Sequence, residues 1–170
     1  MDPGLKRLQD EISAAIQGLS TEELTWRPTD KWSVAQIVEH LYLTYTGTSK
    51  GFSRVIEGGK PAANGSTLRQ RLGALVVVGA GYFPRGVKSP PVAIPRGLPP
   101  EKCCSEVGSK IVEMDEMMAR CAERFGADTK VLDHPVLGSL SVSQWRKFHL
   151  VHGRHHIKQI QSLRRQSKNA

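Results

Sequence analysis

The feature that most constrains the fold is a long irregular segment between two helix-rich parts of the chain. Residues 65–100 contain the proline-rich run SPPVAIPRGLPP, in which regular helix cannot form because proline lacks a backbone N–H and its ring clashes with the preceding turn. We expect one short helix before this run, over residues 67–78, and loop after it. A connection of this length is typical of a helical bundle in which two consecutive long helices run parallel.

Four other segments carry apolar residues at the helical period of three to four positions. They cover residues 5–19, 34–57, 100–125 and 145–163. Asp2 with Pro3 is placed to begin the first helix, Ser33 to cap the second, and Ser141 or Ser143 to cap the last. The sequence therefore predicts an all-α fold, a four-helix bundle with a long crossover between the second and third long helices.

The remaining connections have turn-rich compositions. Residues 20–32 are expected to form an ordered loop, and residues 127–145 a loop or an extended pair of short strands. The chain has 170 residues, of which 39% are hydrophobic and 24% charged, values within the usual range for globular proteins. We therefore expect a single domain over residues 1–170, with a basic tail from about residue 164.

The basic charge of the chain has a local explanation. Lys and Arg total 24 against 16 Asp and Glu, which gives a net charge of +8. Part of the excess is Arg164, Arg165 and Lys168, whose charges oppose the dipole at the end of the last predicted helix. The other basic residues are dispersed and form no recognised nucleic-acid motif, so nucleic acid is not the expected partner.

Several functional classes are excluded by composition. No apolar run approaches the roughly 18 residues of a membrane-spanning helix, and the first residues do not resemble a signal peptide. Cys103, Cys104 and Cys121 are odd in number and lack metal-binding spacing, so we interpret them as reduced, buried structural thiols. We expect a cytoplasmic protein with no membrane partner.

The last predicted helix carries two histidines in the middle of its apolar face. His152 and His156 are four residues apart, so they lie one turn apart on the face that includes Trp145. Histidines rarely occupy a buried face unless their ring nitrogens are satisfied, and a divalent metal ion satisfies them well. The spacing predicts a metal site. The alternative is two partly buried histidines that form hydrogen bonds with backbone or glutamine groups.

Two histidines alone hold an ion weakly, so a third ligand is needed. His40 is the best candidate, because it lies on the flank of the second predicted helix that would meet a neighbouring helix. His149 shares the face of His156 but lies about 10 Å away along the axis, which suits a supporting or core residue. His155 lies near the edge of that face, and His134 is expected to be structural.

Each metal-binding imidazole normally has its second nitrogen held by a hydrogen bond. Gln36, one turn before His40, and Gln159, three residues after His156, are the candidates for this role. Glu39 is expected to point elsewhere and to be solvated. We expect the entrance of the pocket to be formed by the crossover, residues 79–100, and by the loop at residues 26–32.

Two stretches of the sequence resemble the DinB/YfiT-like superfamily of metalloenzymes. They are WSVAQIVEHL at residues 32–41 and HPVLGSLSVSQWRKFHLVHGRHHIKQI at residues 134–160. The resemblance extends over most of the chain through the order of the helices and the crossover. In that superfamily a histidine of the second helix and an H-x₃-H pair on the last helix form a three-histidine metal site. The matching positions here are His40, His152 and His156.

The resemblance implies a metal-dependent enzyme, because relatives in that superfamily include thiol-dependent S-transferases, a thiol-dependent maleylpyruvate isomerase and proposed metal-dependent hydrolases. Three neutral imidazoles leave coordination positions free, as in catalytic metal sites. Zinc or nickel is expected as the ion, with iron or manganese as alternatives, since imidazole suits all four.

The expected partner is a small-molecule substrate, for which a low-molecular-weight thiol is one candidate. A second functional class stays open, namely a non-catalytic metal-binding or stress-related helical-bundle protein. The sequence also leaves a homodimer open.

Overall fold

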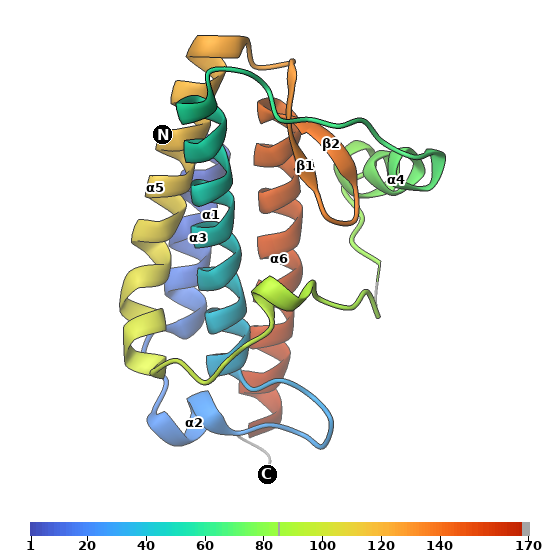
Figure 1. Cartoon of the computed structure of the whole chain (residues 1–170). Helices are drawn as coiled ribbons and strands as arrows, with labels where there is room; N and C mark the ends of the chain where they lie inside the picture. Colours follow the sequence, from blue (N-terminus) through green and yellow to red (C-terminus); the bar gives the residue numbers. More distant parts are fainter. Residues whose placement is uncertain (85, 168–170) are drawn as a thin grey trace.

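The computed structural model describes residues 1–84 and 86–167, and most of these residues are helical. Four long helices lie side by side (Figure 1). They are α1 (Pro3–Ile16), α3 (Val34–Gly58), α5 (Pro100–Phe125) and α6 (Val142–Ser167). In Figure 1 the chain runs in one direction along α3 and α5 and in the opposite direction along α1 and α6. The parallel course of α3 and α5 requires the long connection between them.

Three of the four long helices, α1, α3 and α6, begin at the residues that their capping side chains predict. The Asp2 carboxylate accepts the backbone N–H groups of Gly4 and Leu5 at the start of α1, at 2.8 and 3.1 Å. Ser33 forms a reciprocal capping box with Gln36 at the start of α3, and Ser141 forms the same pair of hydrogen bonds with Gln144 before α6. These bonds satisfy N–H groups that have no partner within the helix. Of the two serines considered for α6, Ser141 is the cap.

Two expectations about the first half of the chain need correction. The first helix ends at Ile16 and not at residue 19, because Gln17 is extended and Gly18 has a φ of +72°. The expected loop at residues 20–32 contains a short helix, α2 (Thr21–Thr25), which begins with a capping box between Ser20 and Glu23. The Ser-x-x-Glu spacing of that box is a helix signal that the nearby Pro28 and Asp30 obscure.

The crossover contains helix only in short pieces. α4 (Leu68–Ala74) continues into a π-helical turn, η1 (Leu75–Gly79), close to the helix expected over residues 67–78. A single 3₁₀ turn, η2 (Pro91–Ala93), lies in the proline-rich run. α4 stands away from the long helices, whereas η2 lies across the front of α3 and α6 in Figure 1. The crossover thus returns to the protein interior at η2.

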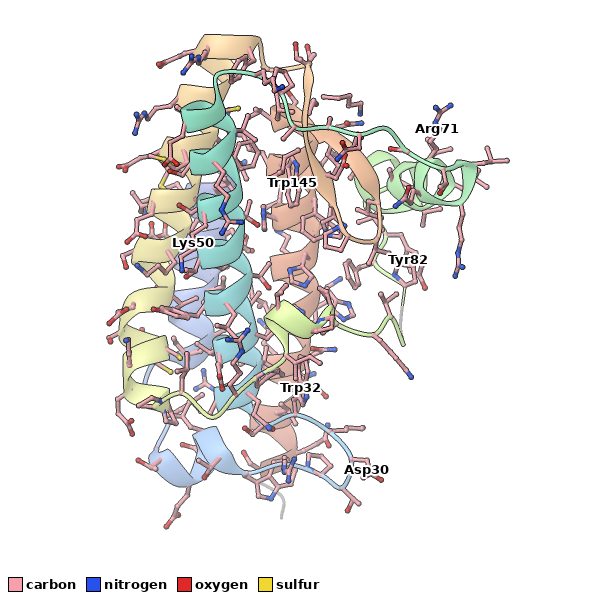
Figure 2. The ribbon with its side chains drawn as sticks, in the orientation of Figure 1. Asp30, Trp32, Lys50, Arg71, Tyr82 and Trp145 are labelled. Atoms are coloured by element: carbon pink, nitrogen blue, oxygen red, sulfur yellow. The ribbon has the colours of Figure 1, made fainter. Side chains whose placement is uncertain are left out.

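An antiparallel hairpin precedes α6, so the described part of the chain is not purely α-helical. Its strands are β1 (Lys130–His134) and β2 (Gly138–Ser141). Figure 2 shows Trp145 beside this hairpin, where its indole N–H donates to the Leu132 carbonyl at 3.2 Å. At the turn, Nδ1 of His134 accepts the N–H groups of Val136 and Leu137, both at 3.1 Å. His134 is therefore structural, as expected.

The long helices share one apolar core, to which the largest fully buried side chains belong. Gly153 lets α6 approach α1 closely, because a Cβ at this position would lie 2.7 Å from Cδ1 of Leu8. Cys103 and Cys121 are buried and Cys104 partly buried, and all three are free thiols. Burial raises the pKa of the Cys103 thiol to about 11, which suits a structural role.

The surface carries the expected basic residues at the end of α6. Arg164 donates to the Ala15 carbonyl at 2.8 Å, so its charge lies at the carboxyl end of α1. Lys168, with the rest of the expected basic tail beyond residue 167, lies outside the described residues. Among the helices of the described ranges, none has the length and apolar character needed to span a bilayer.

Candidate metal centre

Three buried histidines bring one ring nitrogen each to a common point. Nε2 of His152 lies 3.1 Å from Nε2 of His40 and 3.0 Å from Nε2 of His156. The three side chains are 3%, 4% and 6% exposed in the order His40, His152 and His156. They form a group whose nitrogens could hold a metal ion. The structure thus brings together the three residues that the sequence singled out.

The geometry of two facing helices explains this convergence. His152 and His156 are one turn apart on α6, so their rings project from one face. α3 runs antiparallel to α6 (Figure 1), and the ring centre of its His40 lies 5.1 Å from that of His152 and 4.8 Å from that of His156. The site therefore depends on the packing of α3 against α6.

The second nitrogens of two of these rings have hydrogen-bond partners. Nδ1–H of His156 donates to Oε1 of Gln159 at 2.8 Å, which confirms the partner predicted for this ring. Nδ1–H of His40 donates to the backbone carbonyl of Ala93, in η2, at 2.7 Å. Gln36, the residue expected for this role, is instead engaged in the capping box of α3. Sequence inspection missed Ala93, because any residue type can supply a carbonyl.

These hydrogen bonds determine which nitrogens are left to bind a cation. With their protons on Nδ1, His40 and His156 each have an unshared electron pair on Nε2. Both pairs face Nε2 of His152, which can donate at most one proton and therefore to only one of them. The other contact is then left without a proton, and in the other tautomer of His152 neither contact has one, so that unshared pairs face each other. A cation among the three nitrogens would accept all three pairs, so these residues fit a divalent metal ion.

The three rings are uncharged near neutral pH. Burial first, and the neighbouring imidazole of His40 second, lower the pKa of His156 from 6.5 to about 3. Burial also lowers the pKa of His40, although the hydrogen bond to Ala93 opposes this effect. The pKa of His152 lies well below 6.5, because of burial first and of the other imidazoles second. The neutral imidazole is the form that binds metal.

The expectation that Glu39 is solvated is wrong. Glu39 is 2% exposed, and its carboxylate accepts the backbone N–H groups of Arg96 and Gly97 at 2.6 and 3.1 Å. Its neighbour His40 binds Ala93 in the same stretch of the crossover. Two adjacent residues of α3 thus fasten the returning crossover over the site. The helical periodicity gave no sign of this, because the partner comes from an irregular segment distant in sequence.

Aromatic rings surround the three histidines. The Phe148 ring stacks on His152, with ring centres 5.3 Å apart and planes inclined by 13°. The Trp32 ring centre lies 5.3 Å from that of His40. The Phe83 ring centre lies 5.3 Å from that of His152. The two segments expected at the entrance, residues 26–32 and 79–100, therefore both supply side chains that contact the site.

The other histidines of α6 lie outside this group. His149 is fully buried between the rings of Trp145 and Tyr45, with centres 5.6 and 5.5 Å away. His155 is partly exposed, and its Nε2 accepts the amide N–H of Gln159 at 3.1 Å. Gln159 thus joins His155 to His156. The position expected for His149, on the same face but too far along the helix to share an ion, is confirmed.

A family model described as "Protein of unknown function (DUF1569)" matches residues 5–163. The chain belongs to the DUF1569 family. Comparison with curated proteins and with solved structures gave no match. All three histidines of the candidate site lie within the part of the chain that the DUF1569 model matches, so the site belongs to the region that the family shares.

One groove of this DUF1569 chain leads toward the histidines. It has a volume of about 910 Å³ and runs between α1 and α6, with Tyr82, Phe83 and His155 among its lining residues. Phe83 lines this groove and also contacts His152, so the groove reaches a side chain that touches the candidate site.

Proposed function

We propose that this DUF1569 chain is a metal-dependent enzyme, of the hydrolase or thiol-dependent S-transferase type, that binds one divalent ion through His40, His152 and His156. The observation that carries the proposal is the convergence of three neutral imidazole nitrogens, two of which present unshared pairs to the third. Zinc and nickel are the first candidates for the ion, and iron and manganese the next.

The fold supports the same proposal. Four long helices, with a long connection between the second and third, agree with the four-helix bundle of the DinB/YfiT-like superfamily. We propose that DUF1569 chains such as this one share that architecture and its three-histidine site. The hairpin and the short helix α2 add to the architecture without altering the order of the long helices.

The donor set suits a reactive ion better than a purely structural one. When bound by three neutral imidazoles, a divalent ion retains most of its charge and supplies Lewis-acid chemistry, which lowers the pKa of a coordinated water or thiol. Hydrogen bonds to the Ala93 carbonyl and to Gln159 hold the rings of His40 and His156, respectively, in fixed orientations. Trp32, Phe83 and Phe148 exclude bulk water, which strengthens electrostatic interactions at the site.

We propose a small-molecule substrate that reaches the site from the side of Phe83. A low-molecular-weight thiol is one candidate, because a thiol activated by the ion needs no neighbouring side chain as its base. The group that converges on the site contains no carboxylate or cysteine among the described residues. Nucleophile activation is therefore assigned to the ion.

Elemental analysis of the purified protein tests the metal site. We expect about one divalent ion per chain in the wild type, and none in His152→Ala, because two histidines alone bind an ion weakly. His155→Ala is the matched control, since His155 lies on the same helix but outside the group of three. An unchanged metal content in His152→Ala would refute the site.

A second set of measurements separates the two functional classes. A screen for esterase and thiol-transfer activity, performed with the metal-loaded protein, should find turnover that His152→Ala lacks. If the metal-loaded protein shows no turnover and a chelator lowers its melting temperature strongly, the ion is structural. That outcome would favour the non-catalytic metal-binding class.

A further inference from the structure

A second group of buried polar atoms lies beside the candidate metal centre. Oη of Tyr45, both ring nitrogens of His149 and Nδ1 of His152 have no hydrogen-bond partner among the residues that the structure describes. Tyr45 and His149 are completely buried and His152 is 4% exposed. Buried polar groups in proteins are nearly always paired, with protein groups or with ordered water. These four atoms therefore point to a ligand that completes their hydrogen bonds.

Tyr45 and His149 lie together beside the part of α6 that carries His152. The Tyr45 ring from α3 lies 5.5 Å from the His149 ring, measured between centres. Its hydroxyl extends to α6, where it is 3.1 Å from the position that a Cβ would take at Gly153. Gly153 follows His152 directly and lies one turn after His149. Tyr45 thus places its hydroxyl against the turn of α6 that carries both histidines.

Among the three proposed ligands, His152 is the one whose second nitrogen has no partner. Nδ1 of His40 is held by Ala93 and Nδ1 of His156 by Gln159. The Phe148 ring stacked on His152 offers no strong hydrogen-bonding group to this nitrogen. Metal-bound histidines almost always have this second nitrogen satisfied. Within the described part of the chain, His152 is thus the one proposed ligand whose second nitrogen lacks a hydrogen-bond partner.

We propose that Tyr45 and His149 form a buried polar site that holds one ordered water molecule, and that this water accepts the Nδ1–H of His152. The inference rests on the proposed function, because it assigns His152 as a metal ligand. Buried waters commonly form about three hydrogen bonds with otherwise unpaired groups. His152, Tyr45 and His149 supply that number. Tyr45 and His149 are then positioning residues, which act on the ion through the His152 ring.

Zinc affinity of the Tyr45→Phe variant tests this assignment. The substitution retains the ring and removes only the hydroxyl. We expect zinc affinity, measured by competition with a chromophoric chelator, to fall about 10- to 100-fold, the usual effect of losing such a partner. The metal-free variant should melt at the wild-type temperature or above, because the hydroxyl has no protein partner to lose.

Tyr42→Phe is the matched control. Tyr42 lies three residues earlier on α3, and its hydroxyl donates to Glu106 on α5 at 3.3 Å, away from the site. Zinc affinity of this variant should equal that of the wild type. If both tyrosine variants bind zinc as tightly as the wild type, the positioning role is refuted while the metal site stands. If the wild type itself binds no zinc, the proposed function and this inference both fail.

A second variant examines the shared water. His149→Phe keeps an aromatic ring between Trp145 and Tyr45, and it should lower zinc affinity as Tyr45→Phe does. If both residues act through one water molecule, the double variant should lose little more affinity than either single variant. Fully additive losses would refute the shared site. A high-resolution crystal structure should show a water molecule within hydrogen-bond distance of Nδ1 of His152, and its absence would overturn the proposal.

Discussion

Gln159 is the residue whose side chain does most to define the candidate ligand set. Its Oε1 accepts Nδ1–H of His156, and its amide N–H donates to His155. The first bond keeps the ring proton of His156 on Nδ1, so Nε2 is the nitrogen that faces the proposed ion. The neutral side chain of Gln159, on the protein surface, thus determines which nitrogen of His156 can bind a metal ion.

We predict that Gln159→Ala lowers zinc affinity about 10-fold or more, because His156 loses the acceptor that sets its tautomer and orientation. Competition with a chelator measures the affinity. Gln161→Ala is the control, since Gln161 lies on the same helix and lines the groove instead. Equal affinities in the two variants would show that the Gln159 bond has no role in metal binding.

At the residue scale, the sequence predicts a hydrogen-bond partner correctly only where the two residues lie close together in the chain. Gln159 was found because its partner lies three positions away on the same helix. The prediction that Gln36 forms a hydrogen bond with His40 is wrong, because the Gln36 side chain instead bonds to Ser33 in the capping box of α3. Ala93 and Glu39 were missed because their partners join α3 to a distant irregular segment, whose course no periodicity reveals.

At the scale of elements, the crossover and α3 form one unit around the site. Glu39 binds two successive N–H groups of the crossover, at Arg96 and Gly97, and His40 binds the nearby Ala93 carbonyl. The carboxylate is buried, and these two N–H groups supply hydrogen bonds to its oxygens. η2 is therefore held against α3 by the side chains of two adjacent residues.

We predict that Glu39→Ala releases this part of the crossover. Two backbone N–H groups lose their acceptor, so amide exchange at Arg96 and Gly97 should become faster, and the protein should lose about 1–3 kcal/mol of stability. Hydrogen–deuterium exchange followed by mass spectrometry measures the first effect, and urea unfolding the second. Glu57→Ala, on an exposed part of the same helix, is the control. Unchanged exchange in the Glu39 variant would contradict the fastening role.

The elements themselves were largely predictable, for identifiable physical reasons. The apolar periods predict all four long helices, the caps at Asp2, Ser33 and Ser141 locate the starts of α1, α3 and α6, and the proline run locates the crossover between α3 and α5. α2 was missed because one capping box competed with turn-forming residues. For the hairpin the sequence predicts only a choice between a loop and two short strands, since strand pairing depends on contacts with Trp145 and α6 that short apolar runs do not encode.

At the scale of the whole molecule, the buried histidines couple folding to pH. Burial lowers the pKa of His149 to about 3 and that of His134 to about 4, from an ordinary value of 6.5. Between those values and 6.5 the unfolded chain binds more protons than the folded one. The stability that these two histidines contribute is therefore fully present above about pH 6.5. This contribution to the free energy of unfolding falls as the pH drops toward the folded-state pKa values.

We predict that the metal-free protein is less stable at pH 5 than at pH 7, with His149 alone contributing on the order of 2 kcal/mol to the difference. Urea unfolding at the two pH values measures it. His149→Phe should show a smaller loss, because one protonation site is removed from the unfolded chain. Equal stabilities of the wild type at both pH values would contradict the burial of neutral histidines.

The fastening of the crossover at Glu39 and His40 has a consequence for altering this protein. The three crossover residues that are bound, Ala93, Arg96 and Gly97, lie near the end of the crossover that leads into α5. Phe83 lies before them in the crossover. Replacement segments of different length and chemistry can therefore be grafted around Phe83 while the tether on α3 keeps the imidazoles aligned. In the proposed enzyme, the part that would select a reactant is thus separate from the part that keeps the imidazoles aligned, so each could be redesigned alone.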